Sequence, residues 1–265
     1  MADNIVSEAL KEGLYTRVVG RRILYYEKLP STMDRAAEEV RHGTLEGTVV
    51  LCRQQTAGRG RFQRPWVSSV GNLLLSVVFY PRLQALSYIS IISALAVVRT
   101  IERETDLNPV IKWPNDVMVK GKKVCGLLVE NALEGDSVSH AIVGIGLNVA
   151  LDPGPIPEIA AIATSLDMET GRKVNVGRLL RRLLHELDGL YVALGEGQSP
   201  VEEWRGYLET LGRRVAVQWG EDVVTGHAEG VDEMGHLLLR RDDGTLATLP
   251  AGEVTFQTKA QRPAN

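Results

Sequence analysis

The sequence predicts an α+β protein made of a larger domain, residues 1–210, and a small β-barrel domain, residues 211–265. Through the first 210 residues, segments typical of strands alternate with segments typical of helices. After Gly212 the chain holds only short, closely spaced strands separated by turns, which is typical of a small barrel. An apolar fraction of 44% allows a substantial core for such a fold.

The first elements are predicted from apolar, β-branched runs and from a capping signal. Strands are expected at residues 22–27, 48–54 and 73–80. A hydroxyl of Ser31 or Thr32 can cap the free N–H groups at the start of a helix that runs through residues 34–40. Residues 87–104 carry apolar side chains on nearly every face, which predicts a helix buried on most sides.

Hairpins and two more helices are expected in the middle of the chain. Short strands are predicted at residues 110–112, 117–120, 124–131 and 139–149, with turns at Gly121 and at residues 134–136. After a Pro/Gly loop at residues 152–157, leucines at helical spacing predict an amphipathic helix over 176–194, and a second helix is expected over 200–211. The barrel strands are predicted at residues 214–219, 223–229, 236–240, 245–249 and 254–257.

Composition argues against several classes of function. A net charge of −3 is unlike a protein coated with basic surface for DNA. The N-terminus is acidic, and the longest apolar run, residues 89–98, is too short to span a bilayer, so we expect a cytoplasmic protein that does not bind membranes. Cys52 and Cys125 lie in apolar runs and are expected to be reduced core residues. With no C-x-x-C pair and scattered histidines, a structural zinc site is not expected.

Residues 54–66, QQTAGRGRFQRPW, place glycines and cations where an apolar strand ends. Gly58 and Gly60 allow the backbone to approach a ligand and expose N–H groups to it. The arginines of the segment have geometry suited to phosphate or carboxylate: Arg59, Arg61 and Arg64. The segment matches neither the Walker A nor the G-x-G-x-x-G pattern, and a flexible, solvated basic turn is the alternative interpretation.

KWPND, residues 112–116, forms the second candidate segment. Pro114 favours a rigid turn after the strand. Lys112 could meet an anionic ligand there, and Asp116 could hold Mg²⁺ near phosphates. An ordinary Pro-Asn-Asp turn explains the last three residues but explains the Lys-Trp pair less well.

GKKVCGLLVE, residues 121–130, is the third segment, and its simplest interpretation is a lysine-tipped hairpin. Gly126 lies inside a predicted strand, however, which indicates a bulge or a close approach by another group. A glycine pair in GIGLN, residues 144–148, opens similar space in the next strand. Asn148 could contact an adenine edge or simply cap the strand end.

GRGR followed by Trp66, then KWPND, GKKVCGLLVE and GIGLNV, in this order, resembles the biotin–protein ligase family. The likeness extends from Ser31-Thr32 to the C-terminal strands and covers nearly the whole chain. It implies a class II synthetase-like catalytic domain, with a mixed sheet packed against helices, followed by an SH3-like barrel. It also implies a form without an N-terminal DNA-binding domain, because about twenty residues before the first strand are too few for a helix-turn-helix with its own core.

The resemblance assigns roles to the matching positions. Biotin contacts are implied for Ser31, Thr32, Met33, Gln55, Gly58, Arg59, Gly60, Arg61, Lys123 and Gly126. ATP contacts are implied for Arg59, Arg64, Trp66, Lys112, Asn115, Asp116 and Asn148, with Asp116 as the Mg²⁺ residue. Met33 replaces the family's usual asparagine, and Phe62 and Gln63 replace an Arg-Gly pair, which predicts a less mobile loop.

The implied reaction has two steps. The biotin carboxylate attacks the α-phosphate of ATP, which leaves biotinyl-5′-AMP and releases pyrophosphate, and a lysine of the acceptor then displaces AMP. Lys123 and Arg61 are the expected catalytic residues, because positioned cations stabilise the charge that gathers in both steps. The implied acceptor is the biotin carboxyl carrier domain of a carboxylase, and family members often form homodimers.

Three alternatives stay open. A lipoate–protein ligase shares the fold and the adenylate chemistry, although KWPND and GRGR favour biotin. A bifunctional biotin-operon repressor would need basic residues for DNA, and here the basic segments coincide with the ligase motifs. A module that merely sequesters biotin would not need the ATP-side residues Lys112 and Asp116.

Overall fold

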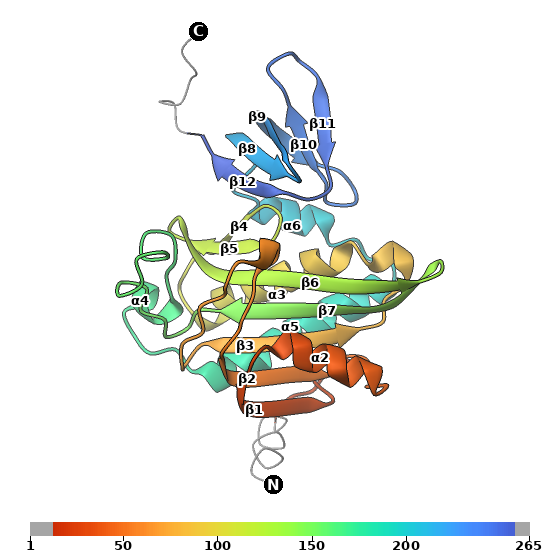
Figure 1. The fold of residues 1–265 in the computed structure, drawn as a ribbon, viewed down its shortest axis with the longest axis vertical. Coiled ribbons are helices and arrows are strands. Elements are labelled where there is room, and N and C mark those ends of the chain that lie inside the picture. The colour runs from red at the N-terminus through yellow and green to blue at the C-terminus, as the bar shows by residue number, and fades with distance from the viewer. Residues whose placement is uncertain (1–12, 258–265) are drawn as a thin grey trace.

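A computed structural model describes residues 13–257 of the chain. It contains a seven-stranded sheet with helices on both faces and a five-stranded sheet at one end (Figure 1). The acidic N-terminal segment, residues 1–12, lies outside the described residues, so the prediction that it carries no leader is not examined by the structure. In the described part, no helix is both long and apolar enough to cross a membrane.

The larger sheet is mixed, as predicted. Its strands are β1 (Ile23–Leu29), β2 (Val49–Gln55), β3 (Leu73–Phe79), β4 (Val110–Lys112), β5 (Asp116–Val119), β6 (Lys122–Glu134) and β7 (Ser137–Leu147). They lie in the order β1-β2-β3-β7-β6-β5-β4, with β1 parallel to β2 and the other neighbours antiparallel. The predicted hairpins form at Gly121 and Gly135, whose φ angles of 77° and 59° suit glycine.

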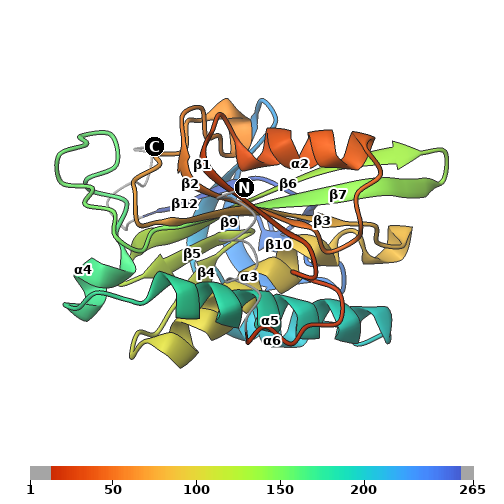
Figure 2. The ribbon, with the colours of Figure 1, turned by 90° about the horizontal axis from the view of Figure 1, so that it is seen from below.

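Helices cover the sheet unequally. α2 (Thr32–Arg41) lies on one face, whereas α3 (Tyr88–Glu104) lies on the other with α5 (Val176–Gly195) and α6 (Val201–Tyr207) beyond it (Figure 2). α2 begins where predicted, because Ser31 Oγ accepts a hydrogen bond from the Met33 N–H at 3.2 Å. α3 is buried on nearly every side, as its composition predicts.

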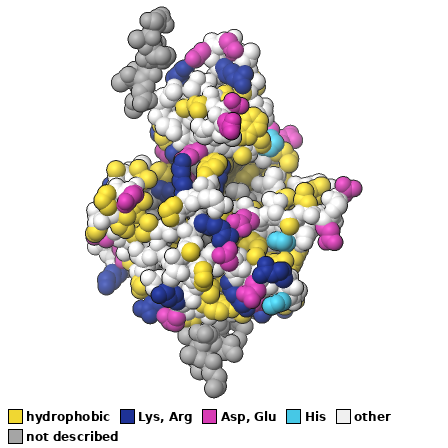
Figure 3. Space-filling view, in the orientation of Figure 1, with side chains coloured by type: hydrophobic (Ala, Val, Ile, Leu, Met, Phe, Trp, Pro, Cys, Tyr) yellow, Lys and Arg dark blue, Asp and Glu magenta, His cyan; other side chains and the backbone are white. Residues whose placement is uncertain are grey.

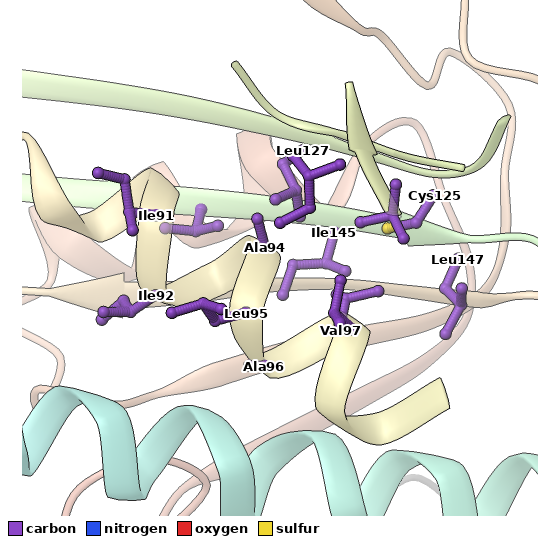
Figure 4. Packing of buried hydrophobic residues seen from close by; sticks show 14 of the residues in the cluster. Ile91, Ile92, Ala94, Leu95, Ala96, Val97, Cys125, Leu127, Ile145 and Leu147 are labelled. Carbon is purple, nitrogen blue, oxygen red and sulfur yellow. The ribbon is translucent and has the colours of Figure 1, made fainter. Parts of the chain in front are cut away.

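Alternation along the strands divides the core between the two faces. On β3, Leu75 joins the main core beneath α3, whereas Val78 joins a smaller cluster beneath α2. Figure 4 shows the main core, where Ala94 of α3 lies next to Leu127 of β6 and Ile145 of β7. A buried side chain of the size of Leu127 or Ile145 stabilises a fold by about 1.5–3 kcal/mol.

The five C-terminal strands all form close to their predicted places. They are β8 (Arg214–Trp219), β9 (Asp222–Val231), β10 (Leu237–Arg240), β11 (Leu246–Leu249) and β12 (Glu253–Phe256). They make one antiparallel sheet in the order β11-β10-β9-β8-β12, so β11 and β12 are its edges. The sheet packs against the rest of the protein through the buried Trp113, whose Nε1 donates to the Gly235 carbonyl at 3.0 Å.

Two helices differ from the prediction. α6 ends at Tyr207 rather than at residue 211, because Leu208 leaves the helix and bridges to Ile111 of β4. A short helix, α4 (Leu166–Thr170), was not predicted and follows the long loop after β7. Short 3₁₀ turns, η1 (Arg61–Gln63) and η2 (Leu83–Ala85), lie outside the sheets.

Asp188 of α5 ties the N-terminal end of the described chain to the core. Its buried carboxylate accepts three backbone hydrogen bonds, from Arg17 N at 2.8 Å, Val18 N at 2.7 Å and Val19 N at 2.8 Å. These three consecutive N–H groups precede β1 and have no strand partner, so the Asp188 carboxylate satisfies donors that would otherwise be unpaired.

Asp188→Ala should lower the free energy of unfolding by about 2–3 kcal/mol, because buried N–H donors lose a charged acceptor. Asp188→Asn, with one acceptor oxygen, should lie between this variant and the wild type. Urea unfolding followed by circular dichroism measures both. Asp136→Ala, at an exposed hairpin tip, is the control, and an Asp188→Ala midpoint equal to that of the control would contradict the anchoring role.

Candidate active site

A cavity of about 720 Å³ opens on the face of the large sheet that carries α2. Its walls come from the start of α2, the loop at residues 58–66, β6, β7 and the loop at residues 151–163. All but three of the predicted site residues line it: Ser31, Thr32, Met33, Gln55, Arg59, Gly60, Arg61, Arg64, Trp66, Asp116, Lys123, Gly126 and Asn148. The tertiary structure therefore gathers segments that are far apart in the sequence.

Glycines form the floor of the cavity. Gly126 on β6 and Gly146 on β7 are paired neighbours, and the Trp66 indole lies across both. A Cβ atom on Gly146 would lie 2.5 Å from Trp66 Cε2, and one on Gly126 would lie 2.7 Å from Trp66 Cζ3. Gly144 gives the same room to Met33, whose Sδ would lie 2.8 Å from a Cβ there. Gly126 thus serves the close approach that the sequence indicated.

The loop at residues 58–66 is a small hairpin. Gly60 N donates to Arg64 O at 2.8 Å, and Trp66 N donates to Gly58 O at 2.9 Å. At its tip, Phe62 and Gln63 have φ angles of 55° and 57°. Residues other than glycine rarely adopt this left-handed backbone conformation. The backbone of the loop is therefore strained where Phe62 and Gln63 replace the Arg-Gly pair of the family pattern.

Two arginines of this loop are held by carboxylates. Arg59 pairs with Asp34 of α2 at 2.6 Å and with Glu130 of β6 at 3.3 Å. Arg64 pairs with Glu253 of β12 at 2.5 Å, and this hydrogen bond raises the pKa of Arg64. Ion pairs therefore attach both ends of the loop to other elements, and these two arginine charges are already balanced by carboxylates of the protein.

Arg61 is different. Its guanidinium donates to Asn115 Oδ1 at 3.1 Å and forms no ion pair with any residue between 13 and 257. Burial lowers the pKa of Arg61, although an arginine keeps its charge in proteins. Asn115 is itself fixed, because its Nδ2 donates to Leu127 O at 2.5 Å. The result is a preorganised, partly desolvated cation that faces the cavity.

Lys123 supplies the second cation. Its Nζ lies 2.6 Å from Asp116 Oδ1 and 5.5 Å from the centre of a Trp66 ring. The backbone of Lys123 is fixed by the loop after β7, since Lys123 N donates to Ile162 O at 2.8 Å and Thr164 N donates to Lys123 O at 2.9 Å. Asp116 of β5 and the loop after β7 together position the Lys123 side chain.

Three predicted residues do not line the cavity. Asn115 lies behind Arg61, as described above. Gly58 lies beside Gln55, and a Cβ on Gly58 would lie 2.9 Å from Gln55 Nε2. Lys112 points elsewhere, with its Nζ 5.5 Å from the centre of the Phe256 ring in β12. The structure thus gives Gly58 and Asn115 supporting positions and gives Lys112 none in the cavity.

The sequence interpretation missed an apolar wall and one acidic residue. Ile156, Ile159 and Ile162 line the cavity from the loop after β7, of which the sequence interpretation described only residues 152–157, as a Pro/Gly loop. The three isoleucines are spaced three residues apart, which matches the successive turns of that loop. This spacing was the sequence signal that could have indicated an apolar wall. Glu253 of β12 also lines the cavity, and nothing in its sequence context announces this position.

Metal ligands and thiols are sparse here. Within residues 13–257, no group of three or more His, Cys, Asp or Glu side chains could hold a metal ion. Both cysteines are free and buried, as predicted, and burial raises the pKa of the Cys125 thiol far above its usual range. Cys125 is therefore an inert core residue beneath the site.

Two family models match the chain. The family model described as Biotin/lipoate A/B protein ligase family matches residues 25–148, which places the main domain among the biotin and lipoate ligases. The model described as Biotin protein ligase C terminal domain matches residues 210–256. The chain belongs to the biotin protein ligase family.

Individual relatives resemble the chain over most of its length. It is 35% identical to the bifunctional ligase/repressor BirA of Bacillus subtilis over 89% of this chain and 74% of that protein. It is 34% identical to the biotin–[acetyl-CoA-carboxylase] ligase of Paracoccus denitrificans over 78% of this chain and 89% of that protein. The Aquifex aeolicus biotin protein ligase, solved with biotin and ATP, superposes with a TM-score of 0.74 at 29% identity, covering 89% of this chain and 99% of that chain.

Gly146→Ala should displace the Trp66 indole from the sheet, because the added methyl would lie within 2.7 Å of three indole atoms. Iodide quenching of tryptophan fluorescence should rise, and the rise should be absent in a Trp66→Phe background. Gly189→Ala, on an exposed part of α5 with open space around it, is the matched control. Equal quenching in both alanine variants would show that Trp66 does not need the glycine.

Proposed function

We propose that the protein is an ATP-dependent biotin–protein ligase that makes biotinyl-5′-AMP and transfers biotin to a lysine of a carrier protein. The observation that carries the proposal is the partly buried Arg61 cation, which forms no ion pair among residues 13–257 and faces a largely apolar cavity together with Lys123. Family membership and the relative solved with biotin and ATP support it.

In the first step, the biotin carboxylate and the α-phosphate of ATP must approach although both are anions. Arg61 and Lys123 reduce this repulsion and stabilise the additional charge at the α-phosphate during attack. Arg61 is ready for this role because its position is fixed by Asn115. Lys123 must exchange its contact with Asp116 for a contact with the ligand, and both side chains are about one-third exposed, so this exchange is accessible.

In the second step, a neutral lysine amine of the acceptor attacks the acyl carbon of the mixed anhydride, AMP leaves, and the amine loses a proton. The cations that held the two anions together now stabilise the departing phosphate. The side chains of Ile156, Ile159 and Ile162 form an apolar wall that is proposed to limit the access of water to the reactive intermediate once a ligand is bound.

Asp116 is the residue that would hold Mg²⁺ with the nucleotide. Mg²⁺ needs few protein ligands because it keeps water molecules and binds phosphate oxygens, so the carboxylate of Asp116 in the cavity lining is sufficient. When bound, the ion would screen the negative charge of the triphosphate. Asp116 also keeps Lys123 in place before the ligand arrives.

Other residues receive roles by position. Ser31, Thr32, Met33, Gln55, Gly60 and Gly126 are proposed to surround biotin, and Gly58 to make room for Gln55. Trp66 is proposed for the ATP side. Arg59 and Arg64 are proposed to fasten the loop and to reach ATP only if their carboxylate partners release them. Asn148 is proposed for the adenine side, whereas Lys112 would have to leave Phe256 to reach ATP.

The partners are likewise proposals. The acceptor is proposed to be the biotin carboxyl carrier domain of a carboxylase, supported by the name of the Paracoccus relative. A domain boundary near residue 210 is supported by the start of the second family match. On the face drawn in Figure 3, cationic and anionic side chains are interspersed, which favours the prediction of no DNA binding. A cytoplasmic location and a homodimer stay predictions.

Incubation of the protein with biotin, ATP and Mg²⁺ should give biotinyl-AMP by mass spectrometry, with one pyrophosphate released per adenylate. Lipoate in place of biotin should give far less acyl-AMP. Pyrophosphate without a biotinyl adenylate, or equal use of lipoate, would contradict the proposed substrate.

Lys123→Ala should lower the rate of adenylate formation by about 10²–10³, as expected for the loss of one preorganised charge donor. The neighbouring lysine provides the control: Lys122→Ala, outside the cavity lining, should keep nearly full activity. Single-turnover formation of labelled biotinyl-AMP measures both. A Lys123→Ala rate close to that of Lys122→Ala would remove this residue from the mechanism.

A further inference from the structure

Ser76 is the one polar residue of β3, whose sequence is LLLSVVF. It is fully buried, with a relative exposure of 0%, and does not itself line the cavity. A buried hydroxyl is costly unless it is hydrogen-bonded. Ser76 Oγ donates to Thr32 Oγ1 at 2.8 Å, and Thr32 does line the cavity.

The bond from Ser76 starts a directed chain. Thr32 Oγ1 accepts from Ser76 and donates its own proton to Gln55 Oε1 at 3.0 Å. The Thr32 backbone N–H donates to the same Gln55 oxygen at 2.7 Å. Two donors therefore fix the Gln55 amide with Oε1 toward Thr32. Its Nε2 then lies against Gly58, where a Cβ would come within 2.9 Å of it.

This chain determines what Thr32 and Gln55 offer to a ligand. A hydroxyl has one proton and two lone pairs. Thr32 gives the proton to Gln55 and one lone pair to Ser76, which leaves one acceptor site. Gln55 has its oxygen occupied and keeps the N–H donors of Nε2. Both residues line the cavity, so the pair presents an acceptor beside donors, without net charge.

We propose that Ser76 is a positioning residue that sets this hydrogen-bond polarity and thereby selects a ligand edge with an N–H next to a carbonyl, such as the ring urea of biotin. This inference rests on the proposed function. Ser76 touches no substrate in this role and acts through the Thr32 hydroxyl. When Ser76 is lost, the bond that fixes the position of Thr32 Oγ1 is gone. The Thr32 side chain can then turn its hydroxyl away from Gln55 and donate to a ligand as well as accept.

The test compares biotin with its two cyclic carbamate analogues, in each of which one ring N–H is replaced by oxygen. In the wild type, the analogue that puts an oxygen against the remaining lone pair of Thr32 should have a kcat/KM lower than that of biotin by roughly 10–100-fold. In Ser76→Ala the rotated Thr32 hydroxyl can donate to that oxygen, so the ratio should fall by about 5-fold or more. KM for biotin should rise several-fold while kcat stays nearly unchanged.

Ser93→Ala is the matched control, because Ser93 is equally buried and its Oγ donates at 2.7 Å to Ile89 O within α3. It should leave the substrate ratio unchanged even if stability falls. Ser76→Cys, which keeps a weaker donor, should give an intermediate ratio. If Ser76→Ala and Ser93→Ala discriminate alike while wild-type protein makes biotinyl-AMP, the inference about Ser76 is wrong. Wild-type protein that makes no biotinyl-AMP would overturn the proposed function and this inference together.

Discussion

The partial burial of Arg61, which forms no ion pair with any residue that the structure describes, is the constraint around which the site is organised. A cation partly removed from water without an ion-pair partner is unfavourable, so the fold must hold it in place by other means. Asn115 does this through one hydrogen bond, and Asn115 is in turn fixed by the backbone of β6. An anionic ligand therefore meets a charge that folding has already oriented and partly desolvated, which is the condition for strong electrostatic stabilisation.

The remaining charges of the loop serve its attachment. Arg59 pairs with Asp34 in α2, and Arg64 pairs with Glu253 in the C-terminal sheet. Both pairs have at least one partner that is more than half exposed, and such pairs contribute only about 0–1 kcal/mol each. They fasten the loop without locking it. Glu253 thus brings the C-terminal sheet to the edge of the cavity, and the strained Phe62-Gln63 tip is held between two such attachments.

Much of the fold could be predicted from local patterns. The strands at the centre of the sheet, the Ser31 cap and the helix over residues 176–194 follow from periodicity and capping, which act over a few residues. The end of α6 could not be predicted, because Leu208 leaves the helix to bridge to Ile111, far away in the sequence. For the same reason Lys112 was assigned to the cavity, whereas the C-terminal strand β12 provides Phe256 as its neighbour.

By itself, the sequence determined which residues carry charge, which positions lack a side chain and which family the motifs resemble, because these are properties of the residues and their order. Only the tertiary structure decided that Arg61 is free among the described residues while Arg59 and Arg64 are paired, although all three occupy one short loop. It also decided that Ser76, within an apolar strand, donates a hydrogen bond to Thr32. Charge compensation and hydrogen-bond direction depend on neighbours across the fold, and the linear order of residues does not contain those neighbours.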